Sequence, residues 1–196
     1  MFVVPAVDIR GGLCVNLVQG DYARETVFSN GPVAQAQLWW DALGGGIIHI
    51  VDLDGAKAGR CCVEEELRAL HAAGIAYEVG GGVRSLETIE TIIDAGASRV
   101  ILGTAAHRDP ELLKTACEAF PGMIVVGIDA RDGKVSLSGW LEDTHTDAVS
   151  FAQQVQEAGA ARIIAMIART RRPYRPRCWI KSIVGQIGRA SCRERV

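Results

Sequence analysis

The stretch VVPAVDIRGG, residues 3–12, contains the pattern that decides the fold: an apolar strand that ends in an aspartate, an arginine and two glycines. A second stretch, GIDARDGKV at residues 127–135, repeats the order Asp-x-Arg-x-Gly after another apolar run. The segments that follow also resemble each other, since AQLWWDALGGGII begins at residue 36 and AQQVQEAGAARII at residue 152. The chain therefore contains an internal repeat.

Six short apolar runs are continuous rather than alternating, which is typical of strands that are covered on both faces of a parallel sheet. They are residues 2–9, 47–53, 76–81, 99–104, 123–130 and 162–167. Between most of them lie segments with helical periodicity, at residues 32–43, 63–74, 85–96, 109–120 and 147–159. The alternation predicts an α/β fold with a parallel sheet.

The repeat narrows this prediction, because its second copy begins four strands after the first. Four strands plus four make an eight-stranded (β/α)8 barrel of two halves, and this chain has about six of the eight strands. Strands one and five of such a barrel face each other across its axis, and their carboxyl ends open onto the face where barrel enzymes hold their sites.

Asp8 and Asp129 end these two strands, so they are the candidate catalytic residues. Two carboxyl groups on opposite sides of one substrate suit acid–base chemistry, in which one group gives a proton and the other takes one. The alternative is that each aspartate only caps the turn that follows it. The matched pair favours the catalytic interpretation.

Two glycine-rich loops indicate a phosphate site. VGGGVRS at residues 79–85 follows the third strand, and its glycines allow the backbone to approach an anion at a helix N-terminus. LGTAA at residues 102–106 follows the fourth strand. The candidate binding residues are Gly81, Gly82, Arg84, Gly103 and Thr104. The alternative for the glycine triple is a tight turn with no ligand.

Composition limits the class of protein. The formal net charge is −2, so there is no global basic field that would suggest nucleic acid or an anionic membrane as a partner. The apolar runs are far shorter than a transmembrane span, and no signal peptide is visible at the amino terminus. The six cysteines show no C-x-x-C spacing and are interpreted as reduced thiols, which indicates a cytoplasmic protein.

Five stretches together resemble, in order and spacing, the phosphoribosylformimino-aminoimidazole carboxamide ribotide isomerases of histidine biosynthesis. They are PAVDIRGGLCVNLVQGDYARETVFSNGP, HIVDLDGAKAG, YEVGGGVRS, VILGTAA and GIDARDGKVSLSGWLEDT, and the resemblance extends to about residue 167. The related cyclase barrel of the same pathway is the alternative family, because it shares the repeat. That family is not expected to carry LVQGDY or SGWLEDT.

The resemblance implies a (β/α)8 barrel of the ribulose-phosphate-binding type and an Amadori rearrangement of a ribotide that carries two phosphates. It implies that Asp8 removes the C2 proton and that Asp129 protonates the ring oxygen, with no cofactor and no metal. Trp140 would pack on the imidazole carboxamide, or alternatively only pack within its loop. The resemblance also implies a monomer.

The remaining polar residues near the strand ends have mostly structural interpretations. His49 is expected to be a core histidine with its hydrogen bonds satisfied. Asp52 and Asp54 would contact substrate or organise a turn, and Arg10 and Arg131 would pair with neighbouring carboxylates.

The chain changes character after about residue 168. Residues 169–196 are rich in arginine and hold no acid before Glu194. A basic tail that binds nucleic acid is one interpretation; we favour a shifted reading frame near residue 169 that ends in adapter-derived sequence. Residues 1–168 would then be a partial barrel with strands one and six as bare edges and little activity. An inactive fragment or a phosphate-binding half-barrel is the alternative function.

Overall fold

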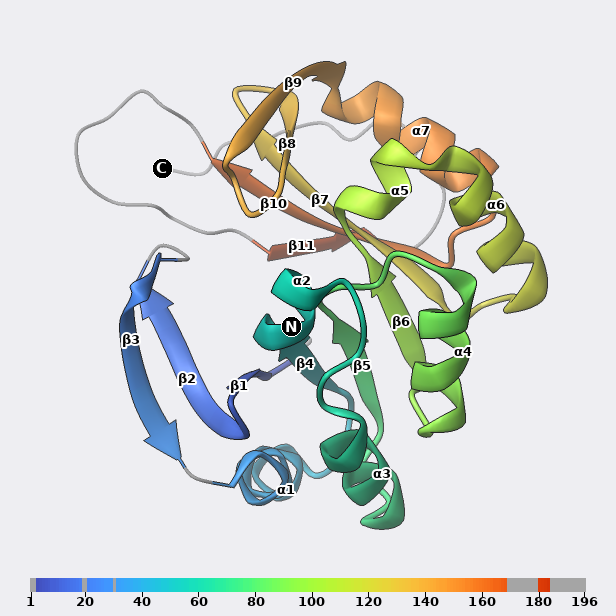
Figure 1. Cartoon of the computed structure of the whole chain (residues 1–196). Helices are drawn as coiled ribbons and strands as arrows, with labels where there is room; N and C mark the ends of the chain where they lie inside the picture. The colour runs from blue at the N-terminus through green and yellow to red at the C-terminus, as the bar shows by residue number, and fades with distance from the viewer. Residues whose placement is uncertain (1–2, 19–20, 30, 169–179, 184–196) are drawn as a thin grey trace.

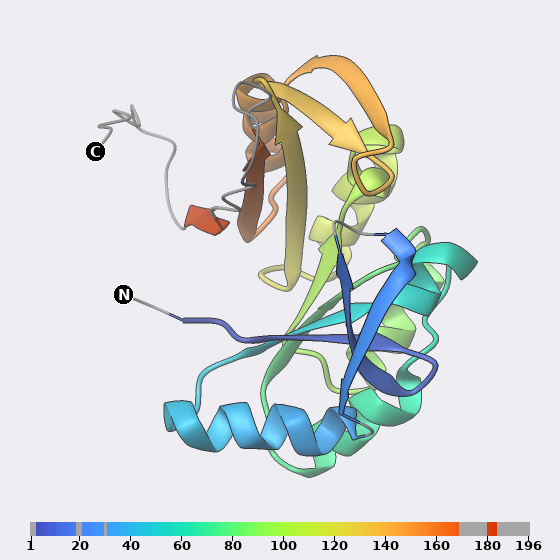
Figure 2. The same cartoon turned by 90° about the vertical axis from the view of Figure 1, so that its left-hand side faces the viewer.

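The computed structural model describes residues 3–18, 21–29, 31–168 and 180–183. Its sheet contains six neighbouring parallel strands, and each of them coincides with one of the six apolar runs. In order along the sheet they are β1 (Ala6–Arg10), β4 (Ile48–Asp52), β5 (Tyr77–Gly80), β6 (Arg99–Leu102), β7 (Ile124–Arg131) and β10 (Arg162–Ala168). The sheet curves as an incomplete barrel does (Figures 1 and 2), which confirms the predicted fold class.

All five predicted helices are present, each within two residues of its expected ends. They are α1 (Pro32–Leu43), α3 (Glu64–Ala72), α4 (Leu86–Asp94), α6 (Pro110–Ala119) and α7 (Ala148–Glu157). Side chains cap three of them, because Ser85, Asp109 and Asp147 accept hydrogen bonds from backbone N–H groups of the first turn. Two short helices, α2 (Leu53–Ala58) and α5 (Thr104–Arg108), were not predicted.

Each half of the repeat also carries a β-hairpin that the apolar pattern did not predict. The first consists of β2 (Leu13–Val18) and β3 (Asp21–Ser29), and the second of β8 (Lys134–Leu137) and β9 (Glu142–Asp147). The two glycines after Arg10 have φ angles of 56° and 73° and form the two-residue turn into β2. Asp132 and Gly133 form the equivalent turn into β8, so the repeat in the sequence is a repeat in the structure.

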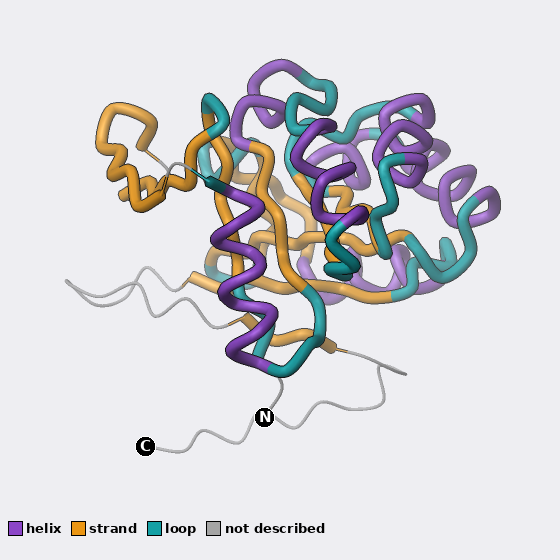
Figure 3. Tube along the Cα trace, turned by 90° about the horizontal axis from the view of Figure 1, so that it is seen from below, coloured by secondary structure: helices purple, strands orange, loops and turns teal. Residues whose placement is uncertain are grey.

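The core lies between the sheet and the helices, which Figures 1 and 3 show on the outer side of the strands. Alternate strand residues face the helices and are buried: Val7, Ile9, Ile48, Ile50, Val79, Val100, Leu102, Ile124, Val126 and Ile128. Burial of each such side chain contributes about 2 kcal/mol to the stability. The residues between them point to the opposite side, which we call the inner face.

The expectation of bare sheet edges is met only in part among the described residues, because each edge strand has a partner over part of its length. β2 pairs with the carboxyl end of β1, at Ile9 and Arg10. A short strand, β11 (Ile180–Ile183), pairs antiparallel with β10. The rest of the chain after residue 168 lies outside the described residues. The predicted frame shift and adapter-derived sequence concern these residues. Among the described helices, none has the length and apolar character needed to cross a membrane.

Candidate active site

The two candidate catalytic aspartates project from the same face of the sheet. Paired residues of neighbouring strands point the same way, and the pairing runs from Asp8 through Val51, Gly80 and Ile101 to Val125. Asp129 lies an even number of residues after Val125 on the same strand, so it shares this direction. Both carboxyl groups therefore belong to the inner face, on strands that stand four apart in the sheet.

Burial raises the pKa of both carboxyl groups. The pKa of Asp129 rises to about 6, and desolvation is the cause. The pKa of Asp8 is also raised by desolvation, while the charge of His49 acts in the opposite direction. Both carboxyl groups therefore bind a proton more readily than a carboxyl group in water does, which suits groups that exchange protons with a bound molecule.

A row of polar residues lies on the inner face, and the sequence analysis named only one of them, His49. His49 Nδ1 lies 3.0 Å from Glu78 Oε1, and Arg99 Nη1 donates to Glu78 Oε2 at 3.1 Å. The three residues oppose one another on β4, β5 and β6. His49 has its hydrogen bond, as expected, but it belongs to the inner face and its side chain is 25% exposed, so it is not a core residue. Lone polar residues inside three apolar runs were the available signal.

The arginine of each repeat anchors the hairpin that follows it. Arg10 forms an ion pair with Glu25 of β3 at 2.6 Å, and Arg131 forms one with Asp143 of β9 at 3.0 Å. These pairs confirm the expected carboxylate partners. Each guanidinium also lies over an aromatic ring of its hairpin, which is Tyr22 in the first half and Trp140 in the second.

The first hairpin is also attached to α2 through Tyr22. Its hydroxyl donates to the Leu53 carbonyl at 3.1 Å, and Lys57 Nζ lies 3.8 Å from the ring centroid. Asp54 of the same helix accepts from the Gly11 N–H at 2.6 Å. Asp52 is buried and accepts from the backbone N–H groups of Gly55 and Cys62 at 2.6 and 2.7 Å, so its role in the structure is to organise the loop after β4.

The glycine-rich loop after β5 packs closely on α2. Gly81 and Gly82 have φ angles of 112° and 73°, and a Cβ on them would lie 2.1 Å from the Asp52 carbonyl oxygen and 1.9 Å from that of Gly55. Arg84 Nη2 donates to the Ala56 carbonyl at 2.8 Å. The glycines thus have a packing role whether or not an anion binds beside them.

The loop after β6 is tied to the second hairpin rather than to α2. Gly103 is exposed and has open space where a Cβ would stand. The Thr104 hydroxyl oxygen accepts from the Ser138 N–H at 2.9 Å. Because β5 and β6 are neighbours, the loops that carry Gly81, Gly82, Gly103 and Thr104 leave the sheet side by side.

We expect Gly82→Ala to lower the free energy of unfolding by about 3 kcal/mol, because the new Cβ meets a backbone oxygen and adopts a left-handed conformation. Gly74 has the same φ of 73° but open space around its Cβ position. Gly74→Ala is therefore the matched control and should cost only about 1 kcal/mol. Urea unfolding of the three proteins measures the difference. Equal losses for the two variants would contradict the close packing of the loop on α2.

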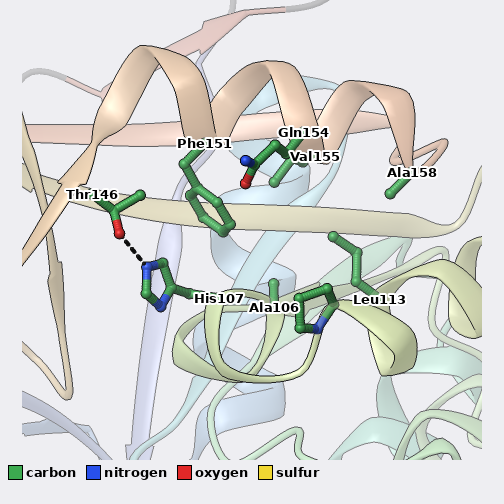
Figure 4. A pocket seen from close by; sticks show the side chains of 9 residues that line it. Ala106, His107, Leu113, Thr146, Phe151, Gln154, Val155 and Ala158 are labelled. Carbon is green, nitrogen blue, oxygen red and sulfur yellow. Dashed lines mark hydrogen bonds between the residues drawn. The ribbon is translucent and has the colours of Figure 1, made fainter.

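A pocket of about 230 Å³ lies elsewhere, between α5, the start of α6 and α7 (Figure 4). Apolar side chains such as Leu113, Phe151 and Val155 line it, and His107 Nε2 is hydrogen-bonded to Thr146 Oγ1 at 2.9 Å beside it. It belongs to the helix layer and not to the inner face. The residues that the structure describes contain no cluster of His, Cys, Asp and Glu suited to a metal ion.

Comparison with known proteins agrees with this architecture. The family model described as histidine biosynthesis protein matches residues 2–169. A protein of Bradyrhizobium sp. strain BTAi1, named as a phosphoribosylated imidazole-4-carboxamide isomerase, is 48% identical over 165 residues, which are 84% of this chain and 66% of the relative. The isomerase of the same name from Pelobacter propionicus is also 48% identical over 165 residues, 84% of this chain and 67% of its own length. The chain thus spans about two thirds of the length of these relatives.

Proposed function

The chain belongs to the family of histidine biosynthesis proteins, and from this premise we propose that its inner face serves an aldose–ketose isomerisation. The substrate class is a ribotide with a phosphate at each end, and the reaction is an Amadori rearrangement of an aminoaldose to its aminoketose isomer. The observation that carries the proposal is the placement of Asp8 and Asp129 on one face of the sheet, both with raised pKa values.

The proposed steps use these two groups in turn. Protonated Asp129 gives its proton to the ring oxygen as the bond from that oxygen to C1 breaks, which opens the furanose and leaves a protonated imine. Asp8 as carboxylate then removes the proton from C2, and the resulting enolamine rearranges to the ketone. In this last step C1 takes up a proton and the C2 hydroxyl loses its own, so C2 is oxidised and C1 is reduced within the substrate and the reaction needs no external oxidant. A pKa of about 6 suits Asp129 to the role of acid.

We propose that the loops after β5 and β6 hold one substrate phosphate, through Gly81, Gly82, Arg84, Gly103 and Thr104. The neighbouring positions of the two loops support this, and so does the open space at Gly103. The Thr104 oxygen accepts a hydrogen bond, which leaves its hydroxyl proton free to donate to a phosphate oxygen. Trp140 is proposed to pack on the imidazole carboxamide, since its hairpin adjoins Asp129.

The proposed partner is the small-molecule ribotide, with no nucleic acid or membrane partner, and the proposed location is the cytoplasm. The four cysteines described by the structure are free, which agrees with a reducing compartment.

An isomerase assay tests the proposal on two proteins: this chain, and a version in which the reading frame after residue 168 is restored. Turnover by the restored version with weak turnover by this chain is the expected result. Binding of the bis-phosphorylated ribotide without turnover by the restored version would contradict isomerisation and favour a phosphate-binding half-barrel.

A further inference from the structure

The turn that presents Trp140 has an unusual backbone. Ser138, Gly139 and Trp140 are consecutive and all left-handed, with φ angles of 54°, 65° and 73°. Only glycine adopts this region without cost, so Ser138 and Trp140 hold it because their surroundings fix them there. Contacts from outside the turn must therefore hold its backbone in this conformation.

Two such contacts exist, one at each end of the turn. Thr104 Oγ1 accepts from the Ser138 N–H at 2.9 Å, and Arg131 Nη2 donates to the Trp140 carbonyl at 3.3 Å. The Arg131 guanidinium carbon also lies 5.7 Å from the centroid of the Trp140 ring, within the range of a cation–π contact. Among the interactions described for Trp140, only those with Arg131 involve both its backbone and its ring.

The guanidinium is itself held in place. Its Nη1 donates to Asp143 at 3.0 Å, and Asp143 also accepts from the buried Ser136 hydroxyl at 2.8 Å. Ser136 stands opposite Asp129 in the sheet, so this chain of contacts begins beside the proposed acid. Arg131 follows Asp129 by two residues and therefore points to the same inner face.

We propose that Arg131 is a positioning residue that holds the Trp140 indole over the inner face, where the isomerisation substrate would bind. The inference concerns the site of the proposed function and rests on it. The first repeat supports it independently, because Arg10 there lies over Tyr22 at 5.1 Å and donates to the Tyr22 carbonyl at 3.2 Å. The same aspartate–arginine–aromatic arrangement occurs in both halves of the fold.

The test uses the whole chain labelled with fluorotryptophan, in which the resonance lost in Trp140→Phe identifies Trp140 among the four tryptophans. Arg131→Met should shift and broaden this resonance and leave the other three unchanged, while Arg131→Lys should have a smaller effect. Arg108→Met is the matched control. Arg108 forms an ion pair with Glu142 of the same hairpin but has no described contact with Trp140, so that variant should leave the resonance unchanged.

Steady-state kinetics of the version with the restored reading frame supply the second measurement. Arg131→Met should raise KM about fivefold with a smaller change in kcat, and the double variant with Trp140→Phe should be no weaker than Trp140→Phe alone. An unmoved Trp140 resonance in Arg131→Met, or losses that multiply in the double variant, would overturn the inference. If the resonance moves but Trp140→Phe leaves KM unchanged, the positioning role stands and the proposed role of Trp140 in binding fails.

Discussion

Replacing Asp8 with asparagine should lower kcat for the proposed isomerisation by about a thousandfold, the middle of the range for loss of a general base. Asparagine keeps the size of the side chain but cannot accept the C2 proton. The fold should be retained, because burial raises the pKa of Asp8 and its charged form is therefore not a source of stability. The measurement is steady-state turnover in the version with the restored reading frame. Circular dichroism of the same protein checks that the fold is retained.

The control for this experiment is Asp94→Asn, which changes an exposed carboxylate of α4 and should leave kcat at its original value. Normal turnover by folded Asp8→Asn would show that another group is the base. A rise in KM with an unchanged kcat would assign Asp8 to substrate binding. The proposed chemistry requires that the loss appear in kcat.

The parallel strands could be predicted from the sequence because each is a continuous apolar run, and burial on both faces of the sheet requires such runs. The hairpins could not be predicted in this way. β3 is exposed or half-buried along its whole length, so no apolar period marks it. Local turn chemistry was the signal present, since a two-residue Gly-Gly or Asp-Gly turn between extended segments favours a hairpin.

Some residues of the candidate site could likewise be predicted from the sequence and others could not. Asp8 and Asp129 could be predicted because the repeat and the strand ends are both visible in the sequence. His49, Glu78 and Arg99 could not, because they are 29 and 21 residues apart and meet only through the register of three strands. The glycines of the loop after β5 were interpreted from their conformational freedom. Their packing on α2 depends on a neighbour that the sequence does not identify.

Asp129→Asn should combine a loss of turnover with a gain of stability. Loss of the proposed general acid should lower kcat by about a hundredfold to ten-thousandfold, the range for one such group. The gain follows from the pKa of Asp129, which burial raises from 3.8 to about 6. A carboxyl group with a raised pKa in the folded state binds its proton more tightly there than in the unfolded chain, so its contribution to stability decreases as the pH rises from about 4 to 6.

The asparagine variant cannot ionise and should therefore keep the stability that the parent loses. The two proteins should have similar free energies of unfolding near pH 3, and at pH 8 the variant should be more stable by up to about 3 kcal/mol, since each pKa unit corresponds to about 1.4 kcal/mol. Asp147→Asn is a control of opposite sign, because hydrogen bonds from Ser150 and Val149 lower the pKa of that carboxyl group. Its variant should be less stable than the parent at pH 8, and the difference should become smaller as the pH falls toward 3. Urea unfolding between pH 3 and 8 measures the stability of both variants and the parent. If Asp129→Asn gains no stability at pH 8, the carboxylate of Asp129 is not held in a desolvated position. The proposed role of Asp129 as the acid requires such a position.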